Sequence, residues 1–139
     1  MQHLRTLLLV PLLLAWPLAR AQEFTALSES TPQLIAVKVW HSALLAGDFS
    51  AYKRAIPDLQ AQPASRAQFD ELRKWTPESV KVSAPRSLPN GNFELTMLGC
   101  KAARRQVVSI VVVKSAATWK VVATGWAQVW GSEARSCPV

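Results

Sequence analysis

The sequence predicts an α+β fold, in which N-terminal helices pack on a curved, four-stranded antiparallel sheet. Between residues 31 and 77, apolar residues recur at steps of three and four, which is the period of a helix with one buried face. From Val80 onward the period changes to two, as in a strand. Helices followed by strands are the order of an α+β domain. The 118 residues after position 21 suffice for one hydrophobic core, so we expect a single domain over residues 22–139.

The first predicted helix begins at Thr31-Pro32, where a threonine N-cap precedes proline at the first helical position. Its apolar face comprises Leu34, Val37, Trp40 or His41, and Leu44. Gly47 is expected to end this helix, because glycine readily adopts the left-handed conformation of a helix C-terminus. Asp48 is the expected N-cap of a second, shorter helix, which Pro57 stops. This second helix presents Phe49, Tyr52 and Ile56.

A third helix is predicted from a capping box, in which Ser65 is followed three residues later by Gln68. It carries Phe69, Leu72 and Trp75 and ends before Pro77. The three predicted helices thus occupy the first half of the mature chain.

Four strands are predicted after the helices. The first contains Val80, Val82 and Ala84, and Asn90-Gly91 is a hairpin turn signal between it and a second strand over residues 93–98. The third, over residues 106–114, is nearly continuous valine and isoleucine, which is typical of a central strand covered on both faces. The fourth is expected to run without a break from Trp119 to Trp130.

The first 21 residues have the pattern of a secretory signal peptide. A short basic start leads into an uncharged apolar stretch over residues 7–18, and Ala19-Arg20-Ala21 places small residues at positions −3 and −1 of a cleavage site. Twelve helical residues span only about 18 Å of a hydrocarbon core of about 30 Å, which disfavours a membrane anchor. An uncleaved N-terminal helix or a buried core helix is the alternative. We expect a periplasmic or secreted protein that lacks a stable membrane anchor.

The charge of the mature chain is moderate. Without Arg5 and Arg20 it carries 14 Lys and Arg against 9 Asp and Glu, a net charge of +5. Outside the cytoplasm the available anions are lipid headgroups, cell-wall polymers and acidic proteins, so no nucleic acid partner is expected. The two cysteines, Cys100 and Cys137, predict one disulfide in an oxidising compartment. Neither has neighbours that could complete a zinc site, and no metal site is expected.

Catalytic groups are scarce in this sequence. The mature chain holds one histidine, His41, and lacks the G-x-S-x-G pattern, so a nucleophile paired with a base is not expected. Asp48 is better explained as a helix cap than as a base, and Glu94 alternates with apolar neighbours and is expected to face water. Nucleotide and metal motifs are missing, so no cofactor is expected.

Aromatic residues are the remaining feature, since the mature chain holds five tryptophans. Most are expected in the core. Alternation along the fourth strand places Trp126 and Trp130 on the face that carries Lys120, Thr124 and Gln128. Such a mixed face is plain core, a protein interface or the lining of a ligand pocket. The residues expected to bind a ligand or partner are Trp126, Trp130, Tyr52, Trp40 and Phe93.

Two segments resemble the NTF2-like (cystatin-like α+β) superfamily and its small exported bacterial members. The stretch from Trp40 through Ala46-Gly47-Asp48 to Tyr52 is similar to the superfamily's first-helix ending, and Thr118-Trp119-Lys120-Val121 is similar to its entry into a late strand. This chain has Ala117-Thr118 where the superfamily commonly carries glycine. The resemblance implies a cone-shaped sheet around a pocket, in a superfamily of isomerases, dehydratases, ligand-binding modules and interaction modules.

The leading hypothesis is therefore an exported NTF2-like binding module without catalytic activity. Its sheet face would bind a protein partner or a second copy of the chain, because the aromatic face is present and catalytic groups are few. A carrier of a small apolar ligand is the second hypothesis. An isomerase or dehydratase, with Asp48 and Tyr52 as the only residues to nominate, is the third.

Overall fold

A computed structural model describes residues 23–57, 64–101, 105–114, 117–123 and 125–129, with Arg105 described by its backbone alone. The predicted signal peptide over residues 1–21 lies outside these residues, as do Trp130 and Cys137. The expected export and the expected disulfide therefore stay predictions. The described residues form three helices and one antiparallel sheet, so the α+β class is confirmed.

The three predicted helices are present and begin at the predicted caps. Helix α1 spans Pro32–Ala46, α2 spans Phe49–Ala55 and α3 spans Arg66–Trp75. The Thr31 side chain accepts a hydrogen bond from the backbone N–H of Leu34, and Asp48 accepts one from Ala51 at 2.9 Å. Gly47 ends α1 with a φ of 71°, the left-handed conformation that its missing Cβ permits.

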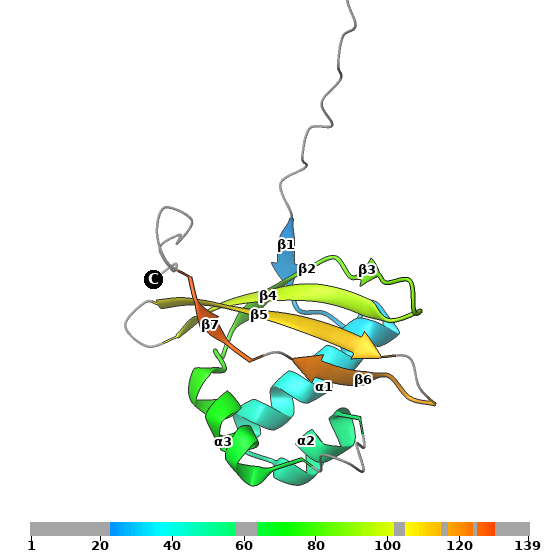
Figure 1. The fold of residues 1–139 in the computed structure, drawn as a ribbon. Helices are drawn as coiled ribbons and strands as arrows, with labels where there is room; N and C mark the ends of the chain where they lie inside the picture. The colour runs from blue at the N-terminus through cyan, green and yellow to red at the C-terminus, as the bar shows by residue number, and fades with distance from the viewer. Residues whose placement is uncertain (1–22, 58–63, 102–104, 115–116, 124, 130–139) are drawn as a thin grey trace, which may run out of the picture.

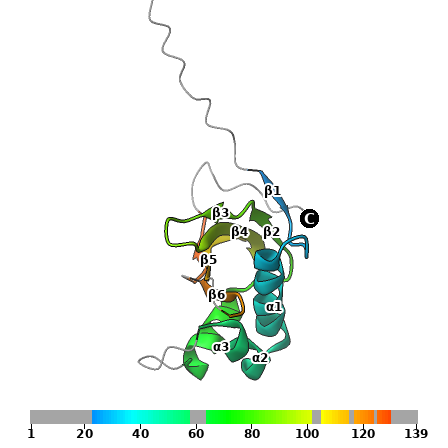
Figure 2. The same cartoon turned by 90° about the vertical axis from the view of Figure 1, so that its right-hand side faces the viewer.

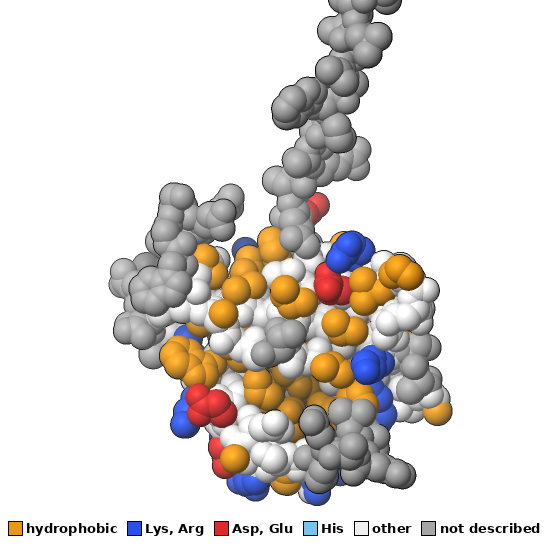
Figure 3. Space-filling model, in the orientation of Figure 1, with side chains coloured by type: hydrophobic (Ala, Val, Ile, Leu, Met, Phe, Trp, Pro, Cys, Tyr) orange, Lys and Arg blue, Asp and Glu red, His pale blue; other side chains and the backbone are white. Residues whose placement is uncertain are grey.

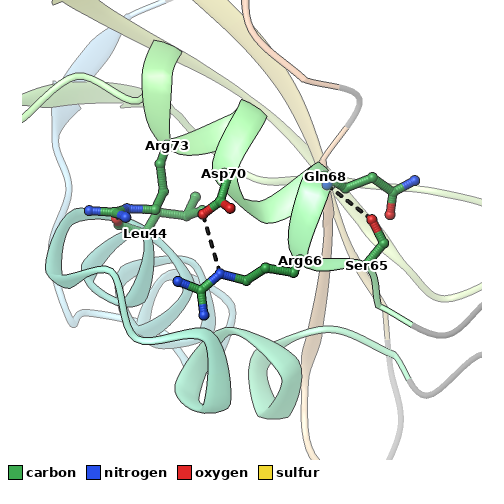
Figure 4. Close-up of polar contacts among 6 residues, drawn as sticks. All are labelled: Leu44, Ser65, Arg66, Gln68, Asp70 and Arg73. Carbon is green, nitrogen blue, oxygen red and sulfur yellow. Dashed lines mark hydrogen bonds and ion pairs between the residues drawn. The ribbon is translucent and has the colours of Figure 1, made fainter.

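Helix α3 is tied to the end of α1 by the side chain of Arg73 (Figure 4). Its cap Ser65 accepts a hydrogen bond from the N–H of Gln68 at 3.0 Å, as predicted. The Arg73 Nε donates to the carbonyl of Leu44 at 3.1 Å. This contact supplies a positive charge and a donor to the C-terminal carbonyls of α1, where the helix dipole favours both. Arg73 therefore fixes α3 against the end of α1.

The sheet contains seven strands among the described residues, and all of its pairings are antiparallel. Five of them follow the order β1-β2-β4-β5-β6, with β3 beside β4 and β7 beside β5. The strands are β1 (Phe24–Ala26), β2 (Val80–Ser83), β3 (Arg86–Ser87), β4 (Phe93–Lys101), β5 (Arg105–Lys114), β6 (Lys120–Ala123) and β7 (Ala127–Gln128). The predicted Asn90-Gly91 turn connects β3 to β4, with Gly91 at a φ of 80°.

The predicted unbroken strand from Trp119 to Trp130 is wrong. Strand β6 ends at Ala123 and β7 begins at Ala127, and Gly125 between them has a φ of 102°, which does not fit an extended strand. Both strands pair with β5. Strand β6 pairs with the residues after Ile110, and β7 pairs with the residues before Ser109. The alternation of faces assumed for one strand therefore does not carry across the break.

A second interruption of strand pairing lies on the other side of the central strands β4 and β5, between β2 and β3. Strands β2 and β3 both pair with β4 and are separated by Ala84-Pro85, opposite the middle of β4. Thr96 of β4 faces Ile110 of β5, so the two breaks share one transverse row. The outer strands bend at this row, and the sheet forms an arc with α1 along its open side (Figure 2).

Strand β1 was not predicted. It has three residues and pairs with β2 through Phe24 and Ser83, and three residues are too few to display a period. Its position at the sheet edge is visible in Figure 1.

The core lies between α1 and the inner face of the sheet. Val37 and Trp40 of α1, Phe69 of α3 and alternate residues of β4 and β5 are fully enclosed. The expectation that both faces of residues 106–114 are covered is wrong, because Val107, Val111 and Val113 are buried while Ile110 on the other face is 46% exposed. The helices cover one face of the sheet only (Figure 2).

Candidate functional site

One face of α3 and the strand β6 enclose a groove, which is the candidate site. Two adjoining hollows of about 420 Å³ each make up this α3–β6 groove, and they share Tyr52, Gln68, Leu72 and Ala123. The first hollow is lined by Tyr52, Gln68, Glu71, Leu72, Trp75, Ala123, Gly125 and Trp126. The second adds Trp40, Ile56 and Val121. Volumes of this size are typical of small-molecule sites.

Three of the five predicted binding residues meet at this groove. Tyr52 lines both hollows, Trp40 lines one and Trp126 lines the other. Phe93 does not belong to it, because it packs edge-on against Trp119 with ring centroids 5.7 Å apart. Trp130 lies outside the described residues. The groove thus joins residues from α1, α2 and the turn between β6 and β7.

The predicted face of Trp126 is wrong. Its indole packs against the core and lines the groove together with Ala123, whereas alternation had placed these two residues on opposite faces. The Trp126 Nε1 donates a hydrogen bond to the Thr76 Oγ1 at 3.1 Å, and the Thr76 Oγ1 in turn donates to the carbonyl of Leu72 at 2.7 Å. The positive φ of Gly125 reverses the direction of the next side chain, so Trp126 turns towards α3.

Tyr52 belongs to an aromatic cluster at the floor of the groove. Its ring lies 5.0 Å from Phe69, which lies 5.3 Å from Phe49. Burial raises the pKa of the Tyr52 phenol above 10, so the hydroxyl is neutral at physiological pH. Within the described part of the chain, the Tyr52 hydroxyl makes no hydrogen bond, and it is not among the fully enclosed polar atoms. It is thus free to bind a polar group in the groove.

The polar rim of the groove comes from α3. Gln68, Glu71, Leu72 and Trp75 follow one another at helical spacing and so share a face of that helix. The Glu71 carboxylate contacts the Lys74 Nζ at 2.8 Å and accepts a hydrogen bond from the Trp75 Nε1 at 3.3 Å. Both contacts lower the pKa of Glu71, and the contact with Lys74 has the larger effect. Sequence reasoning missed Gln68 and Glu71 as lining residues, although this spacing was a possible signal.

The two residues nominated for an enzyme lie apart. Asp48 caps α2 and lines a different hollow on the outer side of α1, whereas Tyr52 lines the α3–β6 groove. Glu94 lies on the outer sheet face and pairs with Arg86 at 2.6 Å. In the described ranges, no cluster of three or more His, Cys, Asp or Glu side chains could hold a metal ion.

His41 is buried on the inner side of α1, and its Nε2 donates to the carbonyl of Pro77 at 2.8 Å. Burial lowers the pKa of this imidazole below 6.5, although the hydrogen bond to Pro77 opposes that effect. His41 therefore has a structural role, because its hydrogen bond joins α1 to the segment before β2.

We expect the pKa shift of His41 to make stability depend on pH. Because the unfolded chain binds a proton at His41 more readily than the folded one, the free energy of unfolding should fall as the pH drops below about 6.5. His41→Gln should flatten this decline, which urea unfolding at pH 5 to 8 would measure. An equal decline in both proteins would contradict this assignment.

The fold and the groove define an α+β protein with an aromatic hollow between a curved sheet and a short helix. Comparison with family models, with curated proteins and with solved structures found no match. In the described part of the chain, no helix has the length and apolar character needed to cross a membrane.

Proposed function

We propose that the mature chain is an exported, non-catalytic binding module whose α3–β6 groove takes a small apolar ligand. The supporting observation is that Tyr52 and Trp126, two of the residues expected to bind, line one groove, with the fully enclosed Trp40 behind one of its hollows. Apolar and aromatic walls with a few polar groups are the usual composition of a ligand site. The resemblance to the NTF2-like superfamily supports the same proposal, because a pocket beside a curved sheet is implied by it.

The groups at the groove indicate the chemistry of the ligand. Trp75 and Trp126 offer flat aromatic surface and Leu72 adds an aliphatic one, which suits a ring or a short aliphatic chain. The neutral Tyr52 hydroxyl can donate to or accept from one polar group of that ligand. Binding is favoured over acid–base catalysis, because the raised pKa of Tyr52 opposes proton loss and Glu71 is engaged by Lys74.

The test compares two tryptophan variants of the mature protein. N-phenyl-1-naphthylamine, a neutral aromatic dye, should bind the wild type, and Trp126→Leu should weaken binding about tenfold through the lost ring contacts. Trp119→Leu is the matched control, because Trp119 packs on Phe93 away from the groove. Fluorescence titration measures both. Equal affinities in the two variants would argue against the groove, as would an empty groove in native mass spectrometry of protein taken from its own host.

A second candidate function is self-association through the outer face of the sheet, the side opposite α1. Its apolar residues are Leu98, Val108, Ile110, Val112 and Val122, on three neighbouring strands. Figure 3 shows hydrophobic side chains spread over this face, with charged ones near its border. An exposed apolar area in the middle of a sheet face is typical of isologous interfaces, in which each copy offers the same surface.

Self-association is expected to depend on Ile110, the most exposed of these side chains. Ile110→Asp should shift the mature protein from dimer to monomer in sedimentation velocity, because it would bury a charge at the interface. Val39→Asp is the control, since Val39 is 52% exposed on α1, away from the sheet. A wild type that stays monomeric at 100-fold higher concentration would exclude this function.

A further inference from the structure

Strand β6 forms one edge of the sheet, and this edge faces the helices α2 and α3. Within the described ranges β6 pairs with β5 alone, so it ends the strand order β1-β2-β4-β5-β6. In an antiparallel pair, successive residues of a strand direct their backbone N–H and C=O groups to opposite sides. Two of the four residues of β6 therefore direct both groups away from β5. Figure 1 and Figure 2 show β6 between β5 and these helices.

The α3–β6 groove runs along this strand edge. Its second hollow is lined by Val121, Val122 and Ala123, which are consecutive residues of β6. Side chains alternate along a strand, so Val121, which is fully buried, lies on the inner face while Val122 lies on the outer face. A hollow that contacts residues of both faces must reach the backbone edge between them. The backbone groups that β6 directs away from β5 are thus accessible from the groove.

The opposite wall of the groove is α3. Gln68 and Leu72 lie across the second hollow from β6, and Trp75 and Trp126 line its continuation past Ala123. A free strand edge beside an apolar groove suits an extended peptide, which adds to the sheet as one more strand. The backbone of such a peptide bonds to the strand edge, and its alternate side chains enter the hollow.

The charges at the two ends of β6 indicate the direction of the added strand. At its start, the neighbouring hollow between α1 and α2 is lined by the cations Arg54 and Lys120, and the described residues of that lining include no carboxylate. At the other end, the charged lining residue is Glu71. The cations are the stronger indication, because Lys74 already contacts Glu71. An antiparallel peptide places its carboxyl end near the cations, which matches them in charge.

We propose that the groove takes the carboxyl end of an extended peptide, which adds to β6 as an antiparallel strand. This inference rests on the proposed function, because the apolar walls of the same groove take the side chains of the peptide. Peptide residues opposite Val121 and Ala123 point into the groove, whereas the residue opposite Val122 points to the outer face. The terminal carboxylate lies near Lys120 and Arg54. The preferred peptide thus has apolar side chains at two alternate positions, shortly before its free carboxyl end.

A labelled peptide tests the added strand. The probe is Gly-Phe-Thr-Leu-Thr with fluorescein on its amino end and a free carboxyl end, so that its phenylalanine lies opposite Ala123 and its leucine opposite Val121. Fluorescence anisotropy with the mature protein measures its affinity. Methylation of the backbone nitrogens after glycine, one at a time, should weaken binding about tenfold at two alternate positions, where the N–H bonds to β6, and much less at the others. Losses that do not alternate, or an absence of binding, would overturn the proposal.

Lys120→Gln tests where the carboxyl end lies. The substitution should weaken the free-acid peptide about fivefold and leave the affinity of its C-terminal amide unchanged, because only the acid carries the charge. Lys38→Gln is the matched control, since Lys38 lies on α1 and pairs with Glu29. Equal losses for the acid and the amide would overturn the proposed direction of the peptide.

Dye binding separates this inference from the proposed function. Protein that binds N-phenyl-1-naphthylamine but not the peptide would overturn the added strand alone, whereas protein that binds neither would count against both proposals. The peptide should displace the dye, and simultaneous binding of the two would overturn the shared site. A stable dimer that takes up no peptide would overturn the proposal in favour of a second copy at the β6 edge.

Discussion

Gly99→Ala is expected to lower the free energy of unfolding by about 3 kcal/mol, at the upper end of the usual cost of overpacking a core. Gly99 is buried in β4, and a Cβ there would lie 2.2 Å from the Cγ and 2.8 Å from the Cβ of Pro77, with the Ser79 carbonyl at 2.9 Å. Two of these atoms belong to a rigid ring and one to the backbone, so none can move aside without displacing the chain. Urea unfolding of the two proteins would measure the difference.

A double-mutant cycle isolates this clash from other effects of the substitution. Pro77→Ala removes the Cγ that is nearest to position 99, so the cost of Gly99→Ala should be smaller in that background by about 1 kcal/mol or more. If the losses of unfolding free energy from the two substitutions simply added in the double variant, a direct clash between positions 77 and 99 would be contradicted. The Pro77–Gly99 contact holds the segment after α3 against the sheet.

Phe69→Ala is expected to cost about 3–5 kcal/mol, the usual range for a fully buried phenylalanine. Phe69 is 0% exposed and contacts the rings of Phe49 and Tyr52 at 5.3 and 5.0 Å. Arg66 and Arg73 lie over its ring with their guanidinium carbons 5.5 and 5.7 Å from the centroid. Truncation would leave a cavity beneath Tyr52, and thermal unfolding followed by circular dichroism would measure the loss.

Phe49→Ala is the matched control for this prediction. Phe49 belongs to the same cluster but is only partly buried, and its ring also lies beneath Lys53 and Arg66. The same truncation should therefore cost about half as much, because less apolar surface returns to water. A larger loss at Phe49 than at Phe69 would mean that the cluster is centred elsewhere.

The ends of the helices could be predicted from the sequence because they depend on neighbours along the chain. Thr31, Asp48 and Ser65 each accept a hydrogen bond from a backbone N–H three residues later, and such a bond requires only local geometry. Gly47 ends α1 for an equally local reason. The change of period near Val80 likewise located the first strand after the helices and with it the α+β class.

The groove could be predicted only in part. Trp126 was named as a binding residue because strand alternation placed it on a mixed apolar and polar face, and nothing in the sequence brings it together with Trp40 and Tyr52. They come from three segments, and their meeting depends on how α3 docks against β6. Glu71 and Gln68 were missed, since a polar residue on a short helix carries no sign of which neighbour it faces.

The sequence by itself determined much of the local structure of this protein: where the helices start and stop, the Asn90-Gly91 turn and the half that forms six of the seven described strands. The tertiary structure alone decided the direction of Trp126, the bend of the sheet and the exposure of Ile110. Alternation assigns a face only while a strand is continuous, and the positive φ at Gly125 interrupts it. Burial on a face depends on which element packs there, and that choice is made by contacts between residues far apart in the chain.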